Sequence, residues 1–116
     1  MFVKYTGGKK VASPKASINS KGFVFLNKGA VINMGLSEAK YVELYYDEQR
    51  AVIGMKFVSE ENDGASKIRI RNSACVFSAR GFLGYNRINI ESTSTYSISK
   101  DEESGLYVID LSKKEP

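Results

Sequence analysis

Hydrophobic and polar residues alternate along much of the chain with the period of two that is typical of β-strands. The clearest case is residues 41–58, where two alternating segments flank a polar turn at 47–50 and predict a β-hairpin. A second hairpin is predicted at 96–111, across a turn at 100–105. Val, Ile, Tyr and Phe are common, and these residues favour strands. The pattern therefore predicts a mainly β protein.

The segment before the first hairpin predicts two short strands and a helical turn. Two apolar stretches flank the turn Ser20-Lys21-Gly22, whose glycine suits a positive φ. Asn27 is placed to cap a helix over 28–34, and Gly35 stands at the position that ends it.

The same order follows in the second half of the chain. Strands are predicted at 67–71 and 76–77, and Ser78 is placed to cap a short helix that runs through Gly84. Residues 87–90 predict the entry into another extended region. The acidic stretch 59–66 reads as a linker between the two halves.

The two halves align as an internal repeat, at an offset of 52 residues in the first strands and 54 in the hairpins. The matched pairs are Ile18 with Ile70, Val24 with Val76, Phe25 with Phe77, Lys28 with Arg80, Leu44 with Ile98 and Met55 with Ile109. Chance similarity between strand segments is the alternative, and we favour a duplication. The predicted organisation is an arm or edge strand at 1–15, repeat one at 16–58, the linker at 59–66, repeat two at 67–112 and a solvated tail at 113–116, all in one compact domain.

Four features in residues 18–56 occur together in a known superfamily. They are the turn Lys21-Gly22, the short strand Val24-Phe25-Leu26, the helix exit Met34-Gly35-Leu36 and the hairpin strand Tyr41–Tyr45. In this combination the chain resembles the AbrB/SpoVT/MraZ superfamily of swapped-hairpin DNA-binding modules. The resemblance implies a β-barrel in which two modules interleave their hairpins. With two tandem repeats, the barrel closes within one chain as a monomeric pseudo-dimer, or the chain forms a homo-oligomer.

The chain departs from the family at the positions that contact DNA. Family members usually carry Arg after the turn glycine, where this chain has Phe23, and basic residues in the helical turn, where it has Val31 and Ile32. In repeat two, Arg87-Ile88 stands where the family has Gly-Leu. The positions that build the barrel match, and those that read DNA mostly do not.

The 116-residue chain has a formal net charge of +4, and no acidic residue precedes Glu38. Lys67, Arg69 and Arg71 alternate with Ile68 and Ile70, which predicts a basic stripe opposite a core-facing side. The stripe suits either an anion or an exposed edge that discourages aggregation. The candidate nucleic-acid or anion-binding residues are Lys9, Lys10, Lys28, Lys67, Arg69, Arg71, Arg80 and Arg87.

The composition argues against an enzyme. The chain has no histidine and one cysteine, Cys75, which its apolar neighbours predict to be buried. We predict no catalytic residue, no metal site and no cofactor. The chain also lacks a signal-peptide core and an apolar run long enough for a membrane span, so we expect a cytoplasmic location.

Two functions from different classes remain. The first is a small DNA-binding transcriptional regulator that docks on phosphates electrostatically. The alternative is a ligand- or protein-binding module on the same barrel that has lost DNA contacts, for example a phage or mobile-element accessory protein that sequesters an anionic nucleotide. A purely structural oligomer is a third possibility. The apolar residues Phe23, Val31 and Ile32 favour the alternative if they are exposed.

Overall fold

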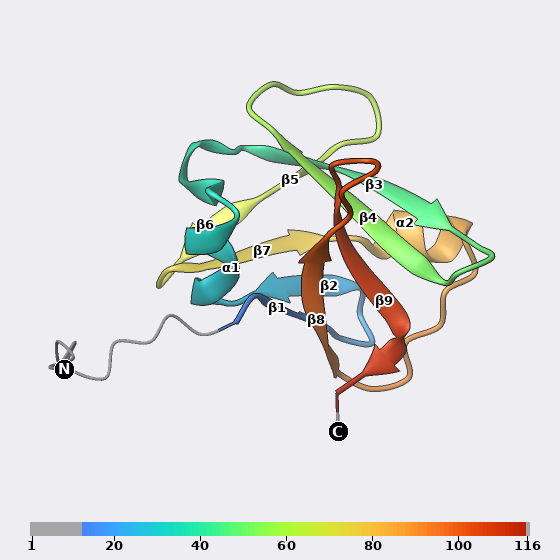
Figure 1. Cartoon of the computed structure of the whole chain (residues 1–116). Coiled ribbons are helices and arrows are strands. Elements are labelled where there is room, and N and C mark those ends of the chain that lie inside the picture. The colour runs from blue at the N-terminus through green and yellow to red at the C-terminus, as the bar shows by residue number, and fades with distance from the viewer. Residues whose placement is uncertain (1–12, 116) are drawn as a thin grey trace, which may run out of the picture.

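One antiparallel sheet curls into a nearly closed barrel in the computed structural model, which describes residues 13–115 (Figure 1). The strands follow the order β5-β3-β4-β9-β8-β1-β2-β7-β6. They are β1 (Lys15–Ile18), β2 (Phe23–Leu26), β3 (Tyr41–Asp47), β4 (Val52–Val58), β5 (Ser66–Lys67), β6 (Arg69–Arg71), β7 (Ala74–Ser78), β8 (Ser94–Lys100) and β9 (Tyr107–Lys114). Two short helices, α1 (Lys28–Asn33) and α2 (Arg80–Tyr85), and a 3-10 turn, η1 (Leu36–Glu38), connect them. The predicted mainly β fold is confirmed.

Both predicted hairpins are present and lie next to each other in the sheet. Strands β3 and β4 pair across the turn at 48–51, and β8 and β9 pair across the turn at 101–106. Strand β4 also pairs with β9, with Gly54 opposite Val108. The two hairpins together therefore form one side of the barrel.

The other side of the barrel consists of β1, β2, β7 and β6, which lie side by side (Figure 1). Its centre is the antiparallel pair β2–β7, in which Val24 lies opposite Phe77. The two sides are joined where β1 pairs with β8. Strand β5 pairs with β3, so the chain from β5 into β6 bridges the remaining gap.

The predicted strand at 67–71 is wrong in one respect: it breaks at Ile68. Lys67 in β5 pairs with Tyr41 of β3, whereas β6 pairs with β7. The Ile68 amide donates to the Lys40 carbonyl oxygen at 3.0 Å, and its side chain is buried. The segment changes partner at this residue, so it cannot form one continuous ladder.

Inward-facing residues of both sides of the barrel meet in a single apolar core. The largest fully buried side chains are Ile18, Leu26, Leu36, Val42, Met55, Cys75 and Ile109. The predicted burial of Cys75 is confirmed, and burial raises the pKa of its thiol to about 11. A thiol in that state is protonated and unreactive at neutral pH.

The caps predicted for the first helix are confirmed. The Asn27 side-chain oxygen accepts from the Ala30 amide at 2.9 Å, and Gly35 follows the helix with a left-handed φ of 63°. The second helix differs from its prediction, because it begins after Ala79. Ser78 is the last residue of β7, and its hydroxyl lies 3.5 Å from the Arg80 amide nitrogen.

The 52-residue offset fails for β2 and β7. It matches buried Val24 with the outward Val76, and exposed Phe25 with buried Phe77. The side that each residue faces agrees instead at an offset of 51. Two residues, Asn72-Ser73, lie between the paired residues Arg71 and Ala74. Three residues, 20–22, lie between Asn19 and Phe23, whose backbones hydrogen-bond across the other turn. In the hairpins the 54-residue offset keeps phase: Met55 and Ile109 are both 1% exposed.

Two segments of the second half differ in part from their predictions. Residues 86–93 contain no strand, and Arg87 has a φ of 56° because its amide and that of Ile88 close the end of α2. Lys113 and Lys114 of the predicted tail are exposed, but they continue β9 and so belong to the sheet. Glu115 then contacts β1 and β8 through its backbone amide and its carboxylate.

Candidate nucleic-acid interface

Charge is divided between the two sides of the barrel. Residues 13–37 and 64–90, which form β1, β2, α1, β5, β6, β7 and α2, contain no Asp or Glu. Their eight cationic residues are Lys15, Lys21, Lys28, Lys67, Arg69, Arg71, Arg80 and Arg87. All thirteen acidic residues of the chain lie in 38–63 and 91–115, the segments that carry the two hairpins. The side formed by β1, β2, β7 and β6 is therefore cationic, which attracts anions.

The outward surface of this cationic side is apolar at its centre. Residues directly opposite each other in antiparallel strands share a face, so Ser17, Phe25, Val76 and Arg69 form one row across four strands. Phe23 is two residues from Phe25 on β2 and points to the same side. We call the surface formed by these five residues the phenylalanine face.

The two phenylalanines are exposed although they lie mid-sheet. Phe23 is 41% exposed and Phe25 is 43% exposed, while the alternate residues Val24 and Leu26 are buried. Strand β2 is thus apolar on both of its faces, and only one of them packs in the core. Two large apolar side chains exposed side by side on one face of a sheet are a candidate interaction surface.

The predicted basic stripe is only partly assembled. Arg69 and Arg71 lie on the outward face of β6, opposite Val76 and Ala74 of β7, so Arg69 borders the phenylalanine face. Lys67 is exposed but belongs to β5, on the other side of the break. Ile70 lies opposite the buried Cys75, on the inward face of β6, but β6 is the last strand of the sheet and Ile70 stays 42% exposed.

A groove of about 650 Å³ lies at the α2 end of the phenylalanine face. Lys21, Phe23, Arg80 and Asn89 line it, and none of its lining residues is acidic. The groove is held in place by the turn before β2, where the Gly22 carbonyl oxygen accepts from the Ala79 amide at 2.7 Å. A basic groove of this size suits a phosphorylated ligand or a nucleotide.

The remaining candidate residues are more dispersed. Lys28 is the first residue of α1, so it lies beyond the opposite end of β2 from Lys21. Arg87 is exposed just after α2 and does not line the groove. Lys9 and Lys10 fall outside the described residues.

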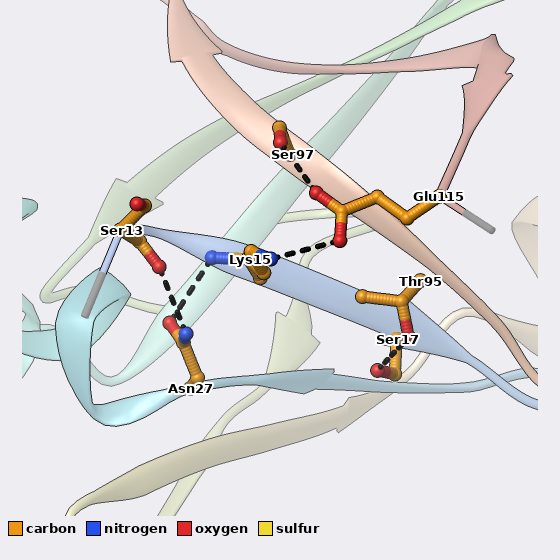
Figure 2. Close-up of polar contacts among 7 residues, drawn as sticks. All are labelled: Ser13, Lys15, Ser17, Asn27, Thr95, Ser97 and Glu115. Atoms are coloured by element: carbon orange, nitrogen blue, oxygen red, sulfur yellow. Dashed lines mark hydrogen bonds and ion pairs between the residues drawn. The ribbon is translucent and has the colours of Figure 1, made fainter.

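One flank of the phenylalanine face is closed by polar contacts between β1, β8 and the C-terminal segment (Figure 2). The Lys15 ammonium donates to a Glu115 carboxylate oxygen at 2.8 Å, and the Ser97 hydroxyl donates to the other oxygen at 2.9 Å. The hydroxyls of Ser17 and Thr95 are 2.9 Å apart. Lys15 is therefore neutralised, and the cations that remain available to an anion lie toward β6 and the groove.

The arginines near the phenylalanine face have no such partners. Among residues 13–115, Arg69, Arg71 and Arg80 form no ion pair with a carboxylate. The sequence identified these three arginines as candidates, but Lys21 and Phe25 were not among the candidate residues. Two signals were available: the acid-free segments, and a strand that is apolar at four consecutive positions.

Other kinds of site find no support in the part of the chain that is described. Within 13–115, no three His, Cys, Asp or Glu side chains come together as metal ligands. None of the helices in this range is long and apolar enough to cross a membrane. No protein-family model, curated protein or solved structure matches the chain.

Proposed function

We propose that this protein is a non-enzymatic nucleic-acid-binding protein, a small DNA-binding transcriptional regulator. The observation that carries the proposal is the acid-free, cationic side of the barrel. Phosphate neutralisation by Lys and Arg is the main source of affinity in such complexes, and it needs cations that no carboxylate already pairs. Arg69, Arg71 and Arg80 meet that condition within the described residues.

We also propose that the barrel consists of two tandem swapped-hairpin repeats. Strand β1 of the first half pairs with β8 of the second, and β5 of the second half pairs with β3 of the first. Equivalent strands meet directly in the pairs β2–β7 and β4–β9. This reciprocal exchange supports an arrangement in which neither half closes a core alone. The resemblance to the AbrB/SpoVT/MraZ superfamily rests on the same segments.

The test is fluorescence anisotropy with a labelled duplex at low salt. We expect binding at micromolar protein and about 50 mM salt, with an affinity that falls as salt rises by a slope of about 0.9 per phosphate contact. The double variant Arg69→Ala/Arg71→Ala should weaken binding and reduce that slope. The matched control is Lys113→Ala/Lys114→Ala, which removes two exposed cations from β9 on the acidic side. Absence of binding to duplex and to single strands at low salt refutes the proposal.

A second candidate function is the binding of a small anionic ligand, such as a nucleotide, in the groove beside α2. Lys21 and Arg80 line that groove, and Phe23 offers a ring for a base. The sequence favoured this function if the apolar residues Phe23, Val31 and Ile32 are exposed. Ile32 on α1 is 51% exposed, as Phe23 is in part, whereas Val31 packs partly against the core. Thermal-shift measurements with mononucleotides, including cyclic ones, distinguish the two functions. A saturable increase in Tm that Arg80→Ala abolishes, without oligonucleotide binding, favours the ligand function.

A further inference from the structure

Phe23 and Phe25 offer two exposed aromatic rings at a regular spacing on a rigid strand. Their Cα atoms are two residues apart on β2, about 6.5 Å along a strand. Neighbouring strands fix the backbone on both sides: β1 pairs with β2 through Ser17 and Phe25, and β7 pairs with it through Val76 and Phe25. The two rings are thus held on a supported sheet and not on a loop.

Cationic residues lie around this pair of rings on three sides. Arg69 and Arg71 lie beyond β7 on the outward face of β6. Lys21 precedes β2, and Arg80 lines the groove that Phe23 also lines. Lys28 follows β2 at its other end. A chain that lies along β2 would therefore meet an aromatic centre and a cationic border.

We infer that the phenylalanine face binds single-stranded nucleic acid, with successive bases stacked on Phe25 and Phe23 and the backbone tracked by Arg69 and Arg71. The bound nucleic-acid strand continues toward Lys21 and Arg80 in the groove. This inference rests on the proposed function and deepens it by naming the form of nucleic acid. Aromatic rings that stack bases and cations that contact phosphates together define sequence-tolerant single-strand binding.

The surface favours a single strand over the other partners that an apolar face can take. In a duplex the bases stack on each other, so their faces are not available to a phenylalanine ring, whereas an unpaired strand presents them. An apolar protein partner would not use the unpaired arginines at the border. The combination of exposed rings with arginines that no carboxylate pairs within the described residues is complementary to a polyanion with aromatic bases.

The test compares a labelled oligothymidine of about ten nucleotides with a duplex of the same length, within the site sizes known for stacking platforms. Single-strand binding should be the tighter of the two. Phe25→Ala and Phe23→Ala should each weaken it by about 5- to 150-fold, the range for loss of one stacked base. Phe25→Leu should also weaken it, since leucine keeps the apolar surface and lacks the ring. Far-UV circular dichroism checks that each variant is folded.

Tyr45→Ala provides a matched control. Tyr45 is 47% exposed on β3, on the acidic side of the barrel, so it has similar exposure without the cationic surroundings. Its loss should leave oligothymidine affinity within about twofold of the parent.

The outcomes separate this inference from the proposed function. Equal or tighter duplex binding, with Phe25→Ala unchanged, overturns the inference and leaves nucleic-acid binding standing. If neither form binds, both fail. If Phe25→Ala instead abolishes self-association in gel filtration and the parent binds no oligonucleotide, the face is a contact between copies of the chain, and the inference is again overturned.

Discussion

Replacement of Gly22 by alanine tests how the turn before β2 is joined to α2. Gly22 has a φ of +88°, its amide donates to the Asn19 carbonyl oxygen at 3.0 Å, and its carbonyl oxygen accepts from the Ala79 amide at 2.7 Å. A Cβ at this position would lie 2.8 Å from the Cα of Arg80. The turn and the start of α2 are therefore in backbone contact, with no room for a methyl group.

The expected loss has two parts. A positive φ costs a residue with a Cβ about 1 to 2 kcal/mol. Overpacking against a backbone atom that cannot rotate away adds about 1 to 3 kcal/mol. Gly22→Ala should therefore lower the free energy of unfolding by about 2 to 5 kcal/mol. Gly64→Ala is the matched control, because Gly64 has a φ of +83° and no atom within 4 Å of the added Cβ, so only the first part applies.

Urea unfolding followed by circular dichroism measures both variants. Gly22→Ala should have a midpoint well below that of Gly64→Ala, with similar m-values. If the two variants lose the same free energy, the contact between Gly22 and Arg80 does not constrain the fold. The described position of the groove would then be wrong.

Three further predictions concern stability and reactivity. Asn27→Ala should lower the free energy of unfolding, measured in urea, by about 1 to 2 kcal/mol, because the Asn27 side chain caps α1 and accepts from the Lys15 amide. The control Asn33→Ala, in the same helix, should change it by less than about 0.5 kcal/mol. Equal losses in the two variants contradict the cap. Cys75 should react with a thiol reagent at pH 8 only when denaturant unfolds the protein, because burial raises its pKa to about 11, and rapid labelling of the folded chain contradicts its burial. A hydrogen bond from Lys15, and to a lesser extent one from Ser97, lowers the pKa of the Glu115 carboxyl in the folded protein. The ionised carboxylate therefore stabilises the fold above pH 4.5, and this contribution is lost as pH falls through the lower pKa of the folded state. Glu115→Gln should flatten this acid limb of the stability curve, and an unchanged acid limb argues against the contact.

Local features of the fold could be predicted from the sequence, and features that depend on partner choice could not. The hairpin turn predicted at 47–50 and found at 48–51, the cap at Asn27 and the helix end at Gly35 each follow from residues a few positions apart. The break at Ile68 does not, because it depends on two different strands competing for one segment. The contact of Glu115 with Lys15 joins residues 100 positions apart, so no local pattern could indicate it.

The repeat illustrates the same limit. Identities at a fixed offset of 52 suggested that Val24 and Val76 are equivalent, but one residue fewer in the turn before β7 turns them to opposite sides of the sheet. A single deletion reverses the facing of a whole strand because the side-chain period is two. Facing direction, and not identity, identifies equivalent positions here.

The candidate site follows the same pattern. Arg69, Arg71 and Arg80 were identifiable as cations without nearby acids. Their neighbours were not, since the adjacency of β2 and β7 that sets Phe25 beside Val76 and Arg69 is a property of the whole sheet. Residues 1–12, with Lys9 and Lys10, lie outside the described range, so the predicted basic arm stays a prediction.

The central claim is that nucleic acid binds the cationic side of the barrel at the phenylalanine face. An NMR titration of the ¹⁵N-labelled protein with oligothymidine tests it most directly, because backbone amide signals report each strand separately. We predict that shifts concentrate in residues 17–28 and 69–80 and follow one saturable isotherm. Shifts confined to the hairpins at 41–58 and 94–114, or no shifts at saturating oligonucleotide and low salt, would contradict the account.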